Sequence, residues 1–214
     1  MKNILCFGDS NTWGYTPLSG ARYSINERWP RVLQADLGDK YHIIEEGLCG
    51  RTVASHMQDR PQRSGQELLP AILESHRPLD LVIVMLGTND LQHCFNLSAE
   101  EIAQNIKSFC LLIKNNEFIS QHSPETKILL ISPAHLAELP KEDQQHFQGG
   151  QLKSKQLAKY YSQVANDLHI EFLDAHNVVQ ITNIDGIHWT KEQHNKFGEM
   201  LSTTINKIFM ISHD

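Results

Sequence analysis

The sequence predicts an α/β domain in three layers, with a five-stranded parallel sheet between two layers of helices. Two observations predict this class. Five short apolar runs alternate with segments whose apolar residues recur at helical spacing, the order expected of parallel strands joined by helical crossovers. The run at residues 80–86 is almost wholly aliphatic, which is typical of a strand buried on both faces of a sheet. Right-handed crossovers then place helices on both faces.

Apolar spacing and helix caps define the elements in the first half of the chain. Pro30 is tolerated in the first turn of a helix, and Gly38 is a suitable residue to end it. Ser64 and Glu67 match a capping box, in which each side chain bonds the backbone of the other residue at a helix start. The elements expected here are strands at residues 4–7, 41–44 and 80–86, helices at residues 28–37 and 64–75, and a long polar loop at residues 45–63.

The second half of the chain continues the alternation of helices and strands. Ser98 with Glu101 and Thr190 with Gln193 also have capping-box spacing, and each pair precedes a segment with a helical apolar stripe. The elements expected here are strands at residues 127–131 and 170–173, helices that begin at residues 98, 151 and 190, and an irregular segment at residues 132–150. Because no repeat or linker interrupts the sequence, we expect residues 1–214 to form a single domain.

Composition narrows the class of protein and its partners. The chain has 214 residues, with 19 basic against 25 acidic side chains and a formal charge of −6. It contains no basic run, so we expect no nucleic-acid partner, and no apolar stretch long enough to span a membrane. The apolar run at residue 4 is too short for a signal peptide, and we therefore expect a cytoplasmic protein. The four cysteines show no zinc spacing and are expected to be free thiols.

Four polar turns that contain glycine follow predicted strands, at residues 8–12, 47–52, 87–90 and 185–188. In a flavodoxin-like sheet of strand order 2-1-3-4-5, the first and third strands flank the switch point where ligands bind. Ser10 and Asn89 are then expected to face each other across that crevice. A single such turn is more typical of a helix cap, but four turns at one edge of a sheet favour a ligand site.

The side chains in these turns match the needs of acyl transfer. A serine such as Ser10 needs a base to take its proton, and the base needs a partner that holds it in place. Asp185 and His188 lie three residues apart around a glycine, so one compact turn can hold both, although a plain helix-entry loop would also look like this. The Asn89 amide and the backbone N–H groups of Gly50 and Ser10 are candidate oxyanion donors. Gly50 could equally be an ordinary turn glycine.

At this point the residues resemble a known family. The turns at residues 8–12, 47–50, 87–90 and 185–188 are similar, in order and spacing, to blocks I, II, III and V of the SGNH hydrolases, the GDSL-type esterases. The resemblance covers nearly the whole chain. It implies a catalytic triad of Ser10, His188 and Asp185, an oxyanion hole made by Ser10, Gly50 and Asn89, and neither a metal nor a cofactor.

Within that superfamily the chain is most similar to the bacterial arylesterase/acyltransferase branch, through the segments 4–17, 45–52, 79–90 and 185–190. That likeness implies hydrolysis of short-chain acyl esters, aryl esters included, with possible acyl transfer to alcohols. It also implies a small-molecule ester as substrate and a possible homo-oligomer. Asn11 stands where the GDSL name has leucine, and Gly50 stands where the close relative has alanine.

Three aromatic residues flank the motifs, and three other functions fit parts of the pattern. Trp13, Tyr15 and Trp189 could line the substrate pocket or could pack beneath the loops. A metallophosphoesterase would need several more converging carboxylates and histidines. A non-catalytic module that binds acyl groups or glycans would leave the reactive groups unused. The substrate could also be an acetylated carbohydrate, an acyl thioester or a lysophospholipid.

Overall fold

The computed structural model describes residues 1–57, 59–117 and 126–210. Its centre is a five-stranded sheet in the order β2-β1-β3-β4-β5, with every neighbouring pair of strands parallel. The strands are β1 (Lys2–Gly8), β2 (Tyr41–Gly47), β3 (Leu81–Met85), β4 (Lys127–Ser132) and β5 (Glu171–Asp174). The predicted fold class and strand order are confirmed.

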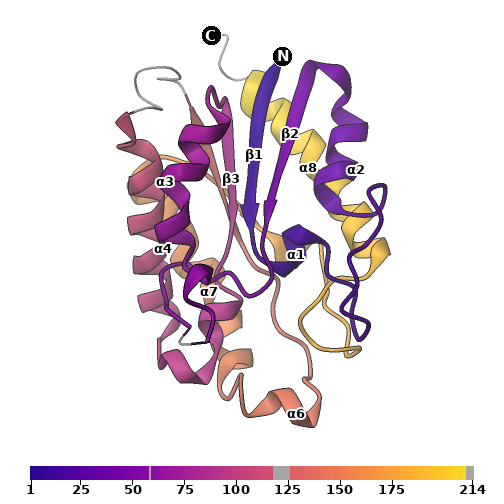
Figure 1. Ribbon diagram of the computed structural model, residues 1–214, viewed down its shortest axis with the longest axis vertical. Helices are drawn as coiled ribbons and strands as arrows, with labels where there is room; N and C mark the ends of the chain where they lie inside the picture. Colours follow the sequence, from indigo (N-terminus) through magenta and orange to yellow (C-terminus); the bar gives the residue numbers. More distant parts are fainter. Residues whose placement is uncertain (58, 118–125, 211–214) are drawn as a thin grey trace.

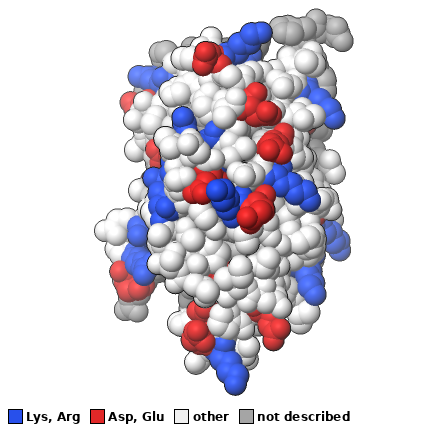
Figure 2. Space-filling view, turned by 90° about the vertical axis from the view of Figure 1, so that its right-hand side faces the viewer, with Lys and Arg blue, Asp and Glu red and all other residues white. Residues whose placement is uncertain are grey.

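Two layers of helices enclose the sheet (Figure 1). One face is covered by α3 (Gly65–His76), α4 (Ala99–Lys114) and α7 (Gly150–Leu168), and the other face by α2 (Trp29–Leu37) and α8 (Lys191–Met210). Figure 2 views the molecule from the side of α2 and α8, where basic and acidic side chains are interspersed. Among the described residues, no helix combines the length and apolar character that a membrane crossing needs.

Short helices complete the chain, and several of them lie near the carboxyl ends of the strands. They are α1 (Ser10–Trp13), α6 (Lys141–Gln144) and the 3₁₀ helices η1 (Gly38–Lys40), η2 (Pro61–Arg63), η3 (Asn89–Leu91), η4 (His93–Phe95) and η5 (Ala175–Asn177). Helix α6 lies inside the segment that we expected to be irregular. Only four residues form it, too few for a helical apolar pattern to be recognised in the sequence.

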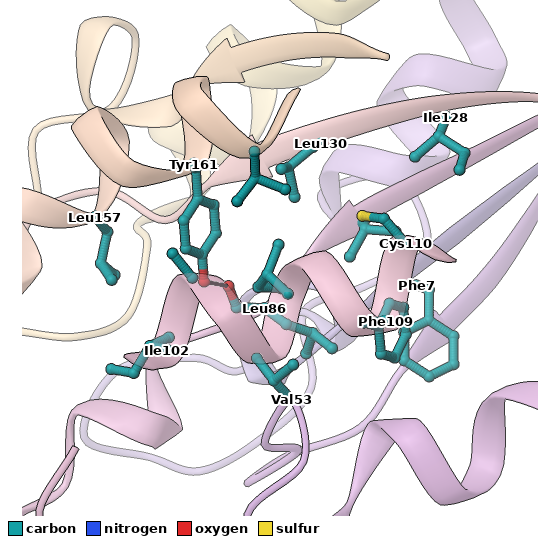
Figure 3. Packing of buried hydrophobic residues seen from close by; sticks show 14 of the residues in the cluster. Phe7, Val53, Leu86, Ile102, Phe109, Cys110, Ile128, Leu130, Leu157 and Tyr161 are labelled. Carbon is teal, nitrogen blue, oxygen red and sulfur yellow. Dashed lines mark hydrogen bonds between the residues drawn. The ribbon is translucent and has the colours of Figure 1, made fainter. Parts of the chain in front are cut away.

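The strands supply two hydrophobic cores because successive side chains of a strand point to opposite faces. In β1, Leu5 and Phe7 belong to the core beneath α3, α4 and α7, whereas Ile4 and Cys6 belong to the core beneath α2 and α8. Figure 3 shows part of the first core, where the rings of Phe7 and Phe109 have their centroids 5.3 Å apart. Burial on both faces explains the aliphatic runs from which the sheet was predicted.

Two of the three expected capping boxes are confirmed. At α4, the Ser98 hydroxyl accepts a hydrogen bond from the Glu101 backbone at 3.2 Å, and the Glu101 carboxylate accepts one from the Ser98 backbone at 2.8 Å. Thr190 and Gln193 bond each other in the same reciprocal way at the start of α8.

The capping box expected at Ser64 and Glu67 is wrong, because Ser64 makes no side-chain cap. The backbone N–H groups of Gly65 and Gln66 instead donate to the carbonyl oxygens of Thr52 and Val53, at 3.0 and 2.9 Å. A neighbouring loop therefore satisfies the first donors of α3, and the helix needs no side-chain cap.

The strand β2 is three residues longer than expected, and its last residue meets α1. Gly47 pairs with Gly8 at the carboxyl ends of the two strands. A Cβ atom on Gly47 would lie 2.2 Å from the backbone nitrogen of Trp13, and one on Gly8 would lie 2.0 Å from the Thr12 hydroxyl. Two glycines thus allow the turn after β1 to pack directly on the sheet edge, and this close approach fixes where Ser10 lies.

Candidate active site

The four polar turns meet at the carboxyl-terminal edge of the sheet. Ser10 opens α1 directly after β1, and Asn89 opens η3 four residues after β3 ends. Asp185 and His188 lie in the loop between η5 and α8. Figure 1 shows α1 at the tip of the β1 arrow. The structure therefore brings together residues that are far apart in the sequence at the switch point between β1 and β3.

Ser10, His188 and Asp185 form a continuous row of side-chain contacts. The Nε2 atom of His188 lies 3.0 Å from the Ser10 hydroxyl oxygen, and its Nδ1 atom lies 2.7 Å from Oδ2 of Asp185. The other Asp185 oxygen accepts hydrogen bonds from the backbone N–H groups of Ile187 and His188, at 3.0 and 2.8 Å. The imidazole ring also stacks on Tyr15, with the ring centroids 4.1 Å apart.

These contacts keep Asp185 ionised. Burial is the largest single influence on its pKa and acts to raise it, but the hydrogen bonds from the His188 side chain and from the backbone together outweigh burial. The pKa of Asp185 is therefore below its ordinary value. A negative charge next to Nδ1 holds the imidazole in the tautomer whose Nε2 can accept a proton from Ser10.

The candidate oxyanion donors lie around the same point. Ser10, Gly50 and Asn89 all line one cavity. The Asn89 amide nitrogen donates one hydrogen bond to the Arg51 carbonyl at 3.0 Å, which fixes the amide and leaves its second N–H for a ligand. Gly50 has a φ of +78°, a conformation that glycine adopts without strain.

Arg51, which we did not predict, ties the loop after β2 to the sheet. Its guanidinium donates hydrogen bonds to the carbonyl oxygens of Gly8, at 3.0 Å, and Glu46, and it lies over the ring of Phe7. Burial lowers the pKa of Arg51 to about 10, so the side chain is still charged at neutral pH. No spacing rule identifies a buried arginine, so this role of Arg51 could not be predicted from the sequence.

Asp90, the residue after Asn89, holds the same loop from the other side. Its carboxylate accepts hydrogen bonds from the backbone N–H of Val53, at 2.9 and 3.1 Å, and from the Ser55 hydroxyl at 3.1 Å. Burial raises the pKa of Asp90 to about 6. The sequence contained a signal here, because Asp90 ends one of the four polar turns, but the turn alone did not reveal its partners.

A cavity of about 690 Å³ opens over Ser10 and His188. Its remaining walls come largely from three segments that the sequence did not place at the site. The apolar lining residues are Met57, Phe95, Phe147 and Ile187, and the polar or charged ones include His56, Asp59, Arg60, Gln92, Asp143 and His146.

The three flanking aromatic residues have different positions. Tyr15 lines the cavity, whereas Trp13 and Trp189 do not. Trp189 is only 1% exposed and packs on Phe197, with the ring centroids 4.8 Å apart. The ring of Trp13 lies under the Arg22 guanidinium. For both tryptophans the structure therefore favours the packing role over a place in the substrate pocket.

The described residues contain no group of three or more histidine, cysteine, aspartate or glutamate side chains placed to hold a metal ion. All four cysteines are free thiols; Cys6 and Cys110 are buried in the cores, and Cys49 and Cys94 line the cavity. Burial raises the pKa of the Cys49 thiol above its ordinary value, which disfavours the nucleophilic thiolate.

Comparisons with known proteins identify the family and several relatives of this chain. A model of the GDSL-like lipase/acylhydrolase family matches residues 6–195, a range that includes all four polar turns. The native aryl esterase of M. smegmatis is 37% identical, with 97% of this chain and 99% of that chain covered and a TM-score of 0.92. Est24, a carbohydrate acetylesterase from Sinorhizobium meliloti, is 36% identical, with coverage of 97% and 100% and a TM-score of 0.91. The isoamyl acetate-hydrolyzing esterase 1 homolog of Homo sapiens is 26% identical over 208 residues, which cover 86% of this chain and 73% of that protein.

The raised pKa of Asp90 predicts a specific dependence of stability on pH. Because the folded state binds this proton more tightly than the unfolded state, the contribution of Asp90 is fully present below about pH 4 and is lost as the pH rises through about 6. Relative to Asp90→Asn, the free energy of unfolding of the wild type should fall across this range by on the order of 3 kcal/mol. Denaturant titrations at several pH values measure the difference. If the difference in unfolding free energy between the wild type and Asp90→Asn stays constant from pH 4 to pH 7, the raised pKa of Asp90 is contradicted.

Proposed function

Because the chain belongs to the GDSL-like lipase/acylhydrolase family and is a carboxylic ester hydrolase, we propose that it cleaves short-chain acyl esters, aryl esters included, through an acyl-enzyme on Ser10. Family membership confirms the resemblance to the SGNH hydrolases. The observation that carries the proposal is the row of contacts from Ser10 through His188 to Asp185, which opens into the cavity.

In the proposed first step, the Ser10 hydroxyl oxygen attacks the carbonyl carbon of the ester while Nε2 of His188 takes the hydroxyl proton. The 3.0 Å contact between these atoms is a normal distance for such a transfer. Asp185, 2.7 Å from Nδ1, stabilises the imidazolium that forms. The oxygen of the former carbonyl becomes an oxyanion.

We assign three donors to that oxyanion: the backbone N–H groups of Ser10 and Gly50 and the second N–H of the Asn89 amide. All three residues line the cavity, and the bond from Asn89 to the Arg51 carbonyl holds its amide in place before substrate arrives. Donors that are already oriented stabilise the developing charge without the cost of reorganisation.

When the tetrahedral intermediate collapses, His188 gives its proton to the departing alcohol, and the acyl group stays on Ser10. A water molecule then attacks the acyl-enzyme with His188 as the base, and the acid and the free enzyme are released. If another alcohol replaces water in this step, the product is a new ester, which is the proposed acyltransferase activity. These steps use only side chains and backbone of the chain, and we propose that no metal or cofactor takes part.

The cavity lining supports both an apolar acyl or aryl group and a second candidate substrate. Phe95, Phe147 and Ile187 supply apolar surface of the kind that small acyl and aryl groups contact. The same cavity is lined by Arg60, Gln92 and other hydrogen-bonding side chains, which would suit the hydroxyl groups of a sugar. Together with the likeness to Est24, this polar lining favours an acetylated carbohydrate as the second candidate.

The partner of the site is thus a small-molecule ester. As the arylesterase resemblance implies, we also propose that the protein forms a homo-oligomer.

Substitution of the proposed catalytic residues should lower turnover by orders of magnitude without unfolding the protein. Ser10→Ala and His188→Ala should each lower kcat/KM for p-nitrophenyl acetate by about a thousandfold or more, since each removes a group that takes part in bond making or proton transfer. Asn89→Ala should lower kcat by on the order of a hundredfold. Ser108→Ala, at an exposed serine of α4, is the matched control and should leave turnover unchanged. Activity retained by Ser10→Ala or by His188→Ala would refute the triad.

A substrate series distinguishes the two candidate classes. We expect p-nitrophenyl esters from acetyl to butyryl to have a higher kcat/KM than long-chain esters, because the resemblance to the arylesterase branch implies short-chain substrates. Acetylated sugars and acyl-CoA are assayed beside them. A higher kcat/KM for acetylated sugars would establish the second candidate, and a preference for long acyl chains would overturn the short-chain proposal.

A further inference from the structure

We propose that Asn11 is a positioning residue that holds His188 at the correct distance from Ser10; this inference rests on the proposed function. Asn11 directly follows Ser10 in the sequence and is only 4% exposed. Its amide nitrogen donates to the Ile187 carbonyl at 3.3 Å, and its amide oxygen accepts from the Trp189 backbone N–H at 3.1 Å. A single side chain therefore bonds the backbone on both sides of His188.

The loop that carries His188 needs such a tie. The contacts of Asp185 with the backbone and side chain of His188 fix these two residues relative to each other, but they do not fix either of them relative to Ser10. The loop also accepts a hydrogen bond at the Gly186 carbonyl, from the Ala137 N–H at 3.0 Å, but this bond joins it to the segment after β4 and not to the turn of Ser10. The Asn11 amide joins the loop to the turn that contains the nucleophile.

The turn itself is a rigid anchor. The backbone N–H of Asn11 donates to the Asp9 carboxylate at 3.0 Å, and the Trp13 N–H donates to the Asp9 carbonyl at 2.9 Å. Tyr15, four residues after Asn11, stacks on the imidazole ring of His188. One short segment thus supplies the nucleophile, the clamp on the backbone around the base, and the surface against which the base rests.

The side-chain amide of Asn11 meets both requirements of this clamp. A carbonyl oxygen must receive a donor and a backbone N–H must receive an acceptor, and the asparagine amide offers both at a fixed spacing. Leucine, the residue in the GDSL name, offers neither, and aspartate offers only the acceptor. Because a displacement of about 1 Å between reacting groups can lower a rate about a hundredfold, the clamp bears directly on catalysis.

The rate at which a fluorophosphonate phosphonylates Ser10 tests the proposal, since it reports the activation of the hydroxyl by His188. Asn11→Leu should lower the maximal rate of phosphonylation by about tenfold to a hundredfold, with the half-saturating probe concentration changed by less than about twofold. Asn183→Ala is the matched control, because Asn183 lies in the same loop as His188 but its side chain accepts a hydrogen bond from the backbone N–H of Glu138, which is outside that loop. The control should label at the wild-type rate.

Asn11→Asp keeps the proposal testable if Asn11→Leu does not fold. This variant has nearly the same shape, retains the acceptor for the Trp189 N–H and loses the donor to the Ile187 carbonyl. Its maximal rate should lie between those of the wild type and Asn11→Leu. A wild-type rate in Asn11→Asp would overturn the two-sided clamp.

The outcomes separate this inference from the proposed function. If Ser10→Ala or His188→Ala is labelled at the wild-type rate, the proposed function itself fails. If both lose labelling while folded Asn11→Leu is labelled like the wild type, only the positioning role of Asn11 fails. A fall in Asn11→Leu that appears equally in Asn183→Ala would also overturn the positioning role, because the effect would then be general loosening of the loop.

Discussion

The contact between the Ser10 hydroxyl and Nε2 of His188 joins two residues 178 positions apart, and much of the structure serves to maintain it. The serine is held by a turn packed on the sheet edge through Gly8 and Gly47. The histidine is held by Asp185, by the Tyr15 ring and by the Asn11 clamp on its backbone. Flexibility on either side would lengthen a contact that must stay near 3 Å to transfer a proton.

Two buried charged side chains hold the loop after β2, which carries Gly50. Arg51 and Asp90 are both buried, and a buried charge costs folding free energy unless it is hydrogen-bonded. Here the partners are largely backbone groups: Arg51 donates to carbonyl oxygens at the ends of β1 and β2, and Asp90 accepts from the N–H of Val53. These bonds offset part of the cost and fix the loop that presents Gly50. The pKa of Asp90 is still raised, because these hydrogen bonds do not offset the whole cost of burying its charge.

The sequence predicted the fold class and the meeting of four turns because both depend on local patterns. Aliphatic runs and helical stripes define the sheet and its layers, and the polar turns follow strand ends whose common edge is set by parallel topology. The features that could not be predicted depend on contacts between segments that are far apart in the sequence. The first backbone N–H groups of α3 donate to the carbonyl oxygens of Thr52 and Val53, so the capping box expected at Ser64 does not form. The last residues of β2 lie in a segment that reads as a polar loop, yet they pair with β1. The cavity walls near Arg60, Phe95 and Phe147 come from loops without a recognisable motif.

The central claim is that Ser10 carries the acyl group between the two halves of the reaction. Rapid acid quenching of the enzyme with p-nitrophenyl acetate, followed by trypsin digestion and mass spectrometry, tests it most directly, because cleavage after Lys2 and Arg22 isolates Ser10 in one peptide. We expect one acetyl group on that peptide, located at Ser10, in the wild type and none in Ser10→Ala. Acetyl transfer to another residue in step with turnover, or turnover with no acetylated peptide in the quenched wild type, would contradict the claim.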